Sequence, residues 1–272
     1  MVDKKNSVYN SIRLERDMSY PFPAIVGILS IFLFAAAYSM LGVGVSNRYV
    51  YLSPGCNSTA ISEEMVSSVD ATNTIATVYP IINCIYVVML VAPLLIAFNL
   101  AQGYNNGQMR TLLSYPIKRR TVLFLKNGSV IFLMFSSGII GTFFSWVFYF
   151  PFSIDLYSVM ILIMTYGITV LAICSTCTLL AVLSRSARIT AFVGVGAWMI
   201  VYTTFVTAVT HSPAAFLLFP LHLGITHISH GGPPYYYEET ELFNVLLGSG
   251  ITLVLVIVVL ILSVIIIERQ EI

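Results

Sequence analysis

Charge is what this sequence lacks most. Asp, Glu, Lys and Arg make up 9% of its 272 residues, against roughly 25% in typical soluble domains. The formal net charge is +1 and hydrophobic residues make up 58%, with a mean hydropathy of +0.89. So few charges cannot cover a water-facing surface of this size. The composition therefore excludes a soluble enzyme, a disordered chain and a basic nucleic-acid-binding protein, and it indicates an integral membrane protein.

The charges are separated by long uncharged stretches, such as residues 18–47 and 242–267. Each stretch exceeds the roughly 20 residues that a helix needs to cross about 30 Å of hydrocarbon. No stretch alternates in polarity as barrel strands do. We therefore predict an all-α integral membrane protein whose single transmembrane domain covers residues 1–272. Its six predicted spans lie near 21–45, 76–101, 129–150, 157–183, 189–210 and 245–267.

The basic residues predict the orientation of these spans. If both termini are cytoplasmic, every Lys and Arg except Arg48 falls on the inner side, as the positive-inside rule requires. The loop 102–128 is then cytoplasmic, and loops 46–75 and 211–244 are external. Residues 9–20 mix apolar and charged side chains, which favours an amphipathic helix on the inner surface over a polar tail. We expect a multi-pass protein of the cell membrane.

The external segment between the fifth and sixth spans holds an apolar run, 214–228, that is interrupted by Pro220. It is too short and too broken to span a bilayer, so we predict a re-entrant segment there. His227 and His230 are spaced to share a helix face, but no carboxylate or Cys stands at ligand spacing. We therefore expect no metal site and keep these two histidines only as weak candidates.

Several smaller signals concern accessibility and packing. Asn57 begins a glycosylation acceptor pattern on the predicted outer side, and Asn127 begins a second one on the inner side. A disulfide bridge between Cys56 and Cys84 stays open, whereas the Cys174-x-x-Cys177 pair is typical of packing within a span.

Small residues allow close approach of helices. We expect this of Ser137, Gly141 and the pairs Gly194-x-Gly196 and Gly248-x-Gly250. None of the predicted spans contains an ionisable residue, which argues against an ion-coupled transporter.

The cytoplasmic loop 102–128 has an ordered pattern. Met109, Leu112 and Leu113 recur at helical spacing and predict a short helix that Pro116 ends. Five basic residues and no acidic ones occur between positions 102 and 126. A simple anchor that touches lipid head groups is one interpretation of this composition.

The order of these residues favours another interpretation. The phrase Gly107-x-x-Arg110-x-Leu-Leu-Ser114-x-Pro116-Ile-x-Arg-Arg120 resembles the signature loop of ABC-2 type permeases, the membrane subunits of ATP-binding-cassette exporters. The six predicted spans and the large external segment before the last span also fit that family. One departure is that Asn105 and Asn106 stand where family members usually carry acidic residues.

The resemblance implies that this loop is a coupling helix that contacts a separate ATPase. The implied contact residues are Gly107, Met109, Arg110, Leu112, Leu113, Ser114, Pro116, Arg119 and Arg120. The chain has no phosphate-binding Gly-x-x-x-x-Gly-Lys-Ser/Thr element, so we expect no enzyme activity and no bound cofactor. ATP and Mg would belong to the partner ATPase.

The remaining expectations concern substrate and partners. The implied partners are ABC ATPase subunits, a second permease (identical or related) and the lipid bilayer, with no nucleic acid. We expect a hydrophobic or amphiphilic substrate to move outward by a narrow route between the two permeases, near the second and fifth spans. The candidate lining residues are aromatic: Phe143, Phe144, Trp198, Tyr202 and Phe205. The alternative function is a non-transporting membrane anchor or assembly factor for a soluble partner, and a membrane enzyme is a third.

Overall fold

The computed structural model describes residues 22–50, 60–105, 119–149, 156–208, 220–228 and 241–269. Within them, side chains are described for 24–38, 78–104, 119–147, 156–202, 220–228 and 241–269. Every secondary-structure element in these ranges is a helix. The predicted amphipathic helix at 9–20 and the glycosylation candidate Asn57 lie outside the described residues.

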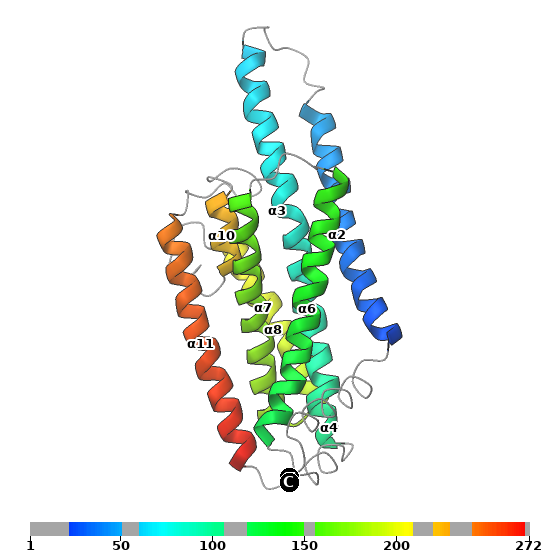
Figure 1. The fold of residues 1–272 in the computed structure, drawn as a ribbon, viewed down its shortest axis with the longest axis vertical. Coiled ribbons are helices and arrows are strands. Elements are labelled where there is room, and N and C mark those ends of the chain that lie inside the picture. Colours follow the sequence, from blue (N-terminus) through cyan, green and yellow to red (C-terminus); the bar gives the residue numbers. More distant parts are fainter. Residues whose placement is uncertain are drawn as a thin grey trace, which may run out of the picture.

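A long helix occupies each of the six predicted ranges. These helices are α2 (Phe22–Val50), α3 (Ala60–Ile96), α6 (Arg119–Tyr149), α7 (Leu156–Ser184), α8 (Ala187–Ala208) and α11 (Leu242–Arg269). Three shorter elements join them: η1 (Ala97–Ala101), α4 (Gln102–Asn105) and α10 (Pro220–Ile228). The protein is thus an all-helical bundle (Figure 1).

Four helical stretches are long and apolar enough to cross a membrane: Val78–Tyr104, Arg119–Val147, Leu156–Ser184 and Leu242–Arg269. In α2 and α8, the apolar parts whose side chains are described are shorter, Ala24–Tyr38 and Ala187–Tyr202. Large apolar side chains also point outward on the bundle surface, among them Phe34, Phe132, Phe192 and Val254. Monomeric soluble proteins rarely expose apolar patches larger than a few hundred Å². Length, composition and exposure together indicate a membrane protein.

The predicted external loop 46–75 is largely helical. α2 continues to Val50, and α3 begins at Ala60 rather than near residue 76. At 1.5 Å per residue, the 37 residues of α3 extend over about 55 Å, well beyond the ~30 Å of a hydrocarbon core. Figure 1 shows α2 and α3 rising past the ends of the other helices. Uncharged length predicts where a helix meets lipid, but a helix can continue into water.

α6 also begins earlier than its predicted span, at Arg119 instead of near 129. Lys126 and Asn127 therefore lie inside a helix, where they are 7% and 5% exposed. Thr178 of α7 donates from Oγ1 to Asn127 Oδ1 at 2.9 Å. Burial and this hydrogen bond make Asn127 unavailable for glycosylation.

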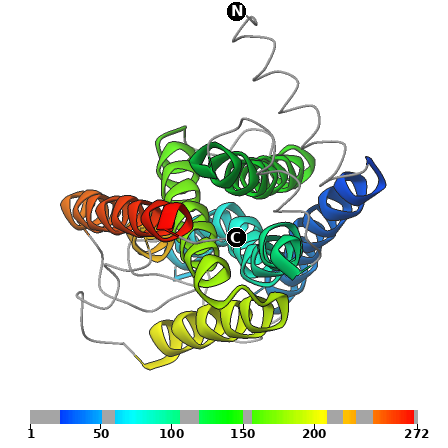
Figure 2. The same ribbon diagram turned by 90° about the horizontal axis from the view of Figure 1, so that it is seen from below.

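α3 and α7 form the centre of the bundle. α3 contacts α2, α6, α7 and α8, and α7 contacts α3, α6, α8, α10 and α11. Seen along the bundle, α6 and α8 lie on opposite sides of this central pair (Figure 2). Residues on α6 and α8 therefore cannot line one path within a single chain.

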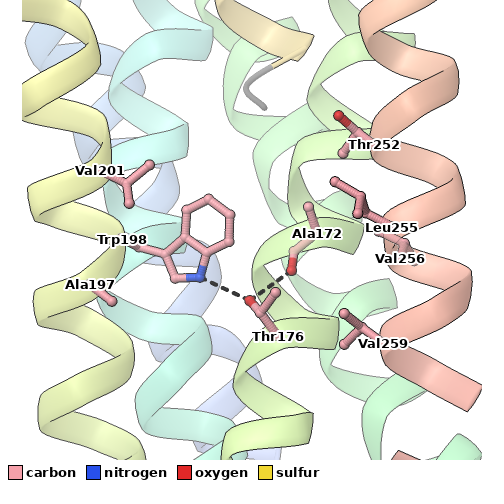
Figure 3. Close-up of a pocket in the computed structure, with 9 residues that line it drawn as sticks. All are labelled: Ala172, Thr176, Ala197, Trp198, Val201, Thr252, Leu255, Val256 and Val259. Atoms are coloured by element: carbon pink, nitrogen blue, oxygen red, sulfur yellow. Dashed lines mark hydrogen bonds between the residues drawn. The ribbon is translucent and has the colours of Figure 1, made fainter. Parts of the chain in front are cut away.

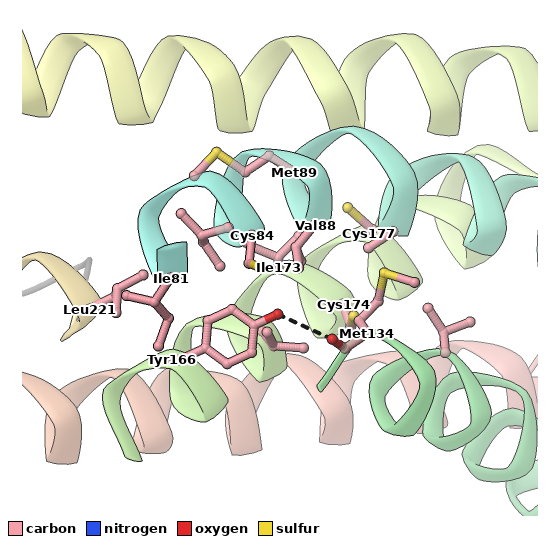
Figure 4. Close-up of a cluster of buried hydrophobic side chains, with 14 of the residues drawn as sticks. Ile81, Cys84, Val88, Met89, Met134, Tyr166, Ile173, Cys174, Cys177 and Leu221 are labelled. Carbon is pink, nitrogen blue, oxygen red and sulfur yellow. Dashed lines mark hydrogen bonds between the residues drawn. The ribbon is translucent and has the colours of Figure 1, made fainter. Parts of the chain in front are cut away.

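A buried tyrosine organises the middle of the core (Figure 4). Tyr166 of α7 donates from Oη to the carbonyl oxygen of Met134 on α6 at 3.1 Å. Its ring stacks on Phe135 with 6.2 Å between ring centroids. Cys84 and Cys174 lie near it, and both are free and buried, as is Cys177 further along α7. The predicted packing role of the Cys174-x-x-Cys177 pair agrees with this burial. Cys84 is free, and Cys56, its candidate partner, lies outside the described residues.

Small residues allow close contacts at two of the predicted places. A Cβ added at Gly141 would lie 3.0 Å from the carbonyl oxygen of Phe32, so α2 and α6 touch there. A Cβ at Gly194 would lie 2.9 Å from Pro93 Cβ, so α8 and α3 touch there. Gly196 and Gly250, by contrast, have nothing within 4 Å of an added Cβ, and they take no part in close helix packing.

Candidate coupling end and lateral groove

Basic residues gather at one end of the bundle. This end holds the end of α4, the start of α6, the turn between α7 and α8, and the end of α11 (Figure 1). Among the described residues, every Lys and Arg other than Arg48 lies in these segments: Arg119, Arg120, Lys126, Arg185, Arg188 and Arg269. Of the described acidic residues, Glu63, Glu64, Asp70 and Glu241 belong to the opposite ends of α3 and α11, and Glu268 lies at the basic end beside Arg269. Most charges of opposite sign are thus separated along the bundle axis.

Arg119 ties the start of α6 to the end of α11. Its guanidinium donates from one Nη atom to the carbonyl oxygen of Ile267 at 3.4 Å. The last carbonyls of a helix have no partner within that helix. A cation that donates to such a carbonyl also interacts favourably with the helix dipole. Arg119 therefore stabilises the last turn of α11 from a neighbouring helix.

Tyr104 brings the other side of the predicted coupling loop to the same place. It lies on α4, and its hydroxyl has no hydrogen-bond partner among the described residues. Arg185 and Arg119 are both close enough to interact with it electrostatically. The residues on either side of 106–118 therefore lie beside the same basic residues. Tyr104 lies near Arg185 and Arg119, and Arg119 contacts the end of α11.

The turn between α7 and α8 is short and held by hydrogen bonds. Arg185 adopts φ 51°, a left-handed conformation that is uncommon outside Gly. Its amide donates to the Ala181 carbonyl oxygen at 3.0 Å, as in an αL helix end. Ser184 Oγ and Thr190 Oγ1 lie 3.1 Å apart across the turn. This network fixes the direction in which α8 leaves α7.

A π-helical turn precedes α4. η1 covers Ala97–Ala101 and follows Pro93, which lies inside α3 and has no amide hydrogen to donate. The amide of Gln102 donates to the Ala97 carbonyl oxygen. π-Helical turns are rare and frequently lie at functional sites. Here the turn contacts α7 and α8, directly before the predicted coupling loop.

Only two of the predicted ATPase-contact residues can be placed. Arg119 is half-buried against α11, and Arg120 beside it is exposed. Gly107, Met109, Arg110, Leu112, Leu113, Ser114 and Pro116 lie outside the described residues. The resemblance places Arg119 at the ATPase contact, whereas its described hydrogen bond joins two helices of the bundle itself.

The predicted pathway residues do not form one lining. Phe143 is 62% exposed on α6 and Phe144 beside it is also exposed, whereas Tyr202 on α8 is only 3% exposed. Tyr202 packs edge-on against Tyr86 of α3 with 4.8 Å between ring centroids. α6 and α8 lie on opposite sides of the bundle (Figure 2). Within a single chain these residues therefore lie on different faces, and the predicted route between two permeases stays a prediction. The side chain of Phe205 lies outside the described residues.

Trp198 instead lines a groove that the sequence did not reveal (Figure 3). The groove has α7 as its floor and α8 and α11 as its walls, with a volume of about 320 Å³. Trp198 Nε1 donates to Thr176 Oγ1 at 3.0 Å, and Thr176 Oγ1 in turn donates to the Ala172 carbonyl oxygen at 2.9 Å. The other lining residues are Ala197, Val201, Thr252, Leu255, Val256 and Val259. The spacing of Thr252, Val256 and Val259 on α11 is the one sequence signal that could have pointed to it.

The far end of the bundle is closed by α10. This helix packs on α7 and α11, and eight of its nine residues are buried. The amide of Leu221 donates to Thr169 Oγ1 of α7 at 3.2 Å. The described part of the segment is therefore a short helix packed within the bundle, which begins at the predicted break, Pro220.

His227 lies at the end of α10, where its Nε2 is 3.0 Å from the Tyr157 hydroxyl oxygen. His230 lies outside the described residues. In the part of the chain that the structure describes, no three His, Cys, Asp or Glu side chains are grouped to hold a metal ion. The described contact of His227 is thus with a tyrosine of α7.

No protein-family model and no curated protein matches the chain in sequence.

Proposed function

We propose that the chain is the permease subunit of an ABC-2 type exporter, with six spans, cytoplasmic termini and a re-entrant segment that contains α10. The observation that carries the proposal is the bracketing of the loop 106–118. Tyr104 precedes the loop, Arg119 follows it, and both interact with the basic end of the bundle. A loop held at both ends by the helix bundle is suited to receive force from a cytoplasmic partner.

The bracketing suggests how such a force would reach the spans. Displacement of the loop would pull on α4 and η1 on one side and on Arg119 on the other. η1 contacts α7 and α8, and Arg119 donates to the last turn of α11. Packed helices shift as units and do not deform continuously. The push of an ATPase on the loop would therefore reach α7 and α8 through η1, and α6 and α11 through Arg119.

The proposed partners follow from what the chain contains. ATP and Mg would bind to separate ATPase subunits, which would dock on Met109, Arg110, Leu112 and Leu113. An apolar contact with flanking guanidinium groups fixes the register of such an interface through charge-assisted hydrogen bonds. A second permease, identical or related, would complete the exporter. Its pathway would combine faces of two chains, which is consistent with the outward-facing Phe143 and Phe144.

The proposed substrate is hydrophobic or amphiphilic, and it would move outward. The described spans expose aromatic and aliphatic side chains on the bundle surface, and the groove beside Trp198 is almost wholly apolar. A pathway between two such surfaces has few groups that could replace the hydration of an ion.

The test is a paired docking experiment. The tagged chain is purified from membranes after cross-linking, and the ATP hydrolysis of the co-purified complex is measured. For the double variant Arg110→Ala/Leu113→Ala we expect at least a ten-fold loss of bound ATPase, the size typical of interface hot spots. The matched control Arg48→Ala/Leu242→Ala makes the same changes at the opposite end and should bind normally.

The outcomes separate the proposal from its alternative. Unchanged ATPase binding by the double variant, with normal membrane insertion, would show that the loop is not the coupling element. A stable partner that hydrolyses no nucleotide would favour a membrane anchor or assembly factor instead. ATP hydrolysis that depends on this chain supports transport.

A further inference from the structure

We propose that the groove between α8 and α11 is a binding site for one acyl chain of a bilayer phospholipid. The site lies within a single chain and does not depend on the transport function proposed above. Its depth in the membrane, the state of its polar groups, its size and its access all favour this occupant.

The groove lies at the middle of every helix that lines it. Thr252 on α11 is ten residues after Leu242, which corresponds to about 15 Å of helix, or half of a ~30 Å hydrocarbon core. Trp198 is likewise central in α8, and Ala172 and Thr176 lie just past the middle of α7. A cavity at this depth is surrounded by lipid tails and not by water or head groups.

The polar atoms that line the groove are already hydrogen-bonded within the protein. Trp198 Nε1 donates to Thr176 Oγ1, and Thr176 Oγ1 donates to the Ala172 carbonyl oxygen. Thr252 Oγ1 donates to the Gly248 carbonyl oxygen at 2.9 Å. No charged side chain lines the groove. A buried water needs two to four polar partners, so hydrocarbon is the better occupant.

The size of the groove also selects its occupant. An apolar cavity of about 150 Å³ can stay dry and bind benzene, and this groove is about twice as large at about 320 Å³. A helix from a second chain, with a diameter of about 10–12 Å, would fill a much larger volume. A slender aliphatic chain fits between these limits.

Access is lateral. α7 contacts both α8 and α11, whereas α8 and α11 diverge above it as the two walls (Figure 3). Ala197 on one wall and Leu255 on the other are exposed on the bundle surface. A tail from the surrounding bilayer can therefore enter sideways while its head group stays at the membrane surface.

The tryptophans make the site directly observable. The chain has two, Trp198 in the groove and Trp146 on α6, so Trp146→Phe leaves Trp198 as the only indole. Phosphatidylcholine brominated near the end of its acyl chains is titrated into the detergent-solubilised protein, and Trp198 fluorescence is recorded. We expect quenching that saturates near one lipid per chain.

Two matched variants distinguish the groove from the general lipid surface. Val259→Phe places a ring in the groove, and Val258→Phe places the same ring on the exposed face of the same helix. Val259→Phe should reduce the quenching several-fold, and Val258→Phe should leave it unchanged. Circular dichroism and gel filtration check the fold, and Ala197→Phe on the exposed wall replaces Val259→Phe if that variant is misfolded.

Three results would overturn the proposal. One is the absence of quenching, as expected if a second copy covers the groove. Another is quenching that rises without saturation and equally in both variants, as expected of a merely lipid-exposed indole. The third is quenching by a brominated free alkane with none by the phospholipid, which would assign the groove to a different aliphatic ligand.

Discussion

At the scale of single residues, Gly138 leaves the least room for change. A Cβ there would overlap the hydroxyl group of Tyr166. The tyrosine cannot easily move away, because its Oη is hydrogen-bonded to the Met134 carbonyl oxygen and its ring is fully buried. Gly138→Ala should therefore lower the free energy of unfolding by about 1–3 kcal/mol, the usual cost of overpacking a core.

Thermal unfolding of the detergent-solubilised protein measures this effect. Gly128→Ala is the matched control on the same helix, since nothing lies within 4 Å of its added Cβ. That control should be neutral or stabilising by up to about 1 kcal/mol, because Ala favours helix more than Gly does. Equal unfolding temperatures for the two variants would contradict the contact between Gly138 and Tyr166.

The sequence located some close contacts but not this one. Gly141 and Gly194 were expected to bring helices together, and each touches a neighbouring helix. Gly138 gave no such signal, because its contact is with the tip of a tyrosine that comes from a different helix. Which glycine meets a bulky partner depends on helix rotation and depth, and one sequence does not specify either.

At the scale of elements, α10 is held to α7 by a contact at its middle. A Cβ at Gly224 would lie 2.7 Å from Thr165 Oγ1 and 3.1 Å from its Cγ2. Gly224→Ala should therefore push α10 away from α7 and lower the unfolding temperature of the solubilised protein by several degrees. The double variant Gly224→Ala/Thr165→Ala removes both atoms and should recover much of the loss.

This double-mutant cycle isolates the contact between the two helices. Thr165→Ala alone provides the reference for the loss of its own hydrogen bonds, which go to carbonyl oxygens of the same helix. Strictly additive effects of the two changes would contradict the packing of α10 on α7.

The bounds of the elements show why the sequence was only partly informative. Uncharged stretches predicted six helices in the right places, because lipid excludes charge from the middle of a span. They did not predict that α3 begins at Ala60 or that α6 begins at Arg119. The first turns of both helices carry charges, which water tolerates and which do not interrupt a helix. Uncharged stretches therefore predict which part of a helix contacts lipid. They do not predict at which residue the helix begins or ends.

At the scale of the whole molecule, the order of the helices around α3 and α7 decides which surfaces can act together. The bundle places α6 and α8 on opposite sides (Figure 2), so Phe143 and Trp198 belong to different faces of one chain. It also creates the groove from three helices that no local pattern links. The arrangement of the helices determines which side chains form a site, and the sequence composition indicates only the chemical character of those side chains.

The basic end of the bundle joins the start of α6 to the end of α11, and that joint can be tested without any partner. Arg119 donates to the Ile267 carbonyl oxygen, whereas Arg120 beside it is exposed. Arg119→Ala should increase the amide hydrogen exchange of the last turn of α11 by about five- to ten-fold, the equivalent of roughly 1–1.4 kcal/mol, which is the usual net contribution of one hydrogen bond. Arg120→Ala removes the same charge one residue away and should leave that exchange unchanged. Equal exchange in both variants would show that net charge, and not the hydrogen bond, stabilises this end. A selective effect would show that the boundary of the loop is mechanically joined to the last helix.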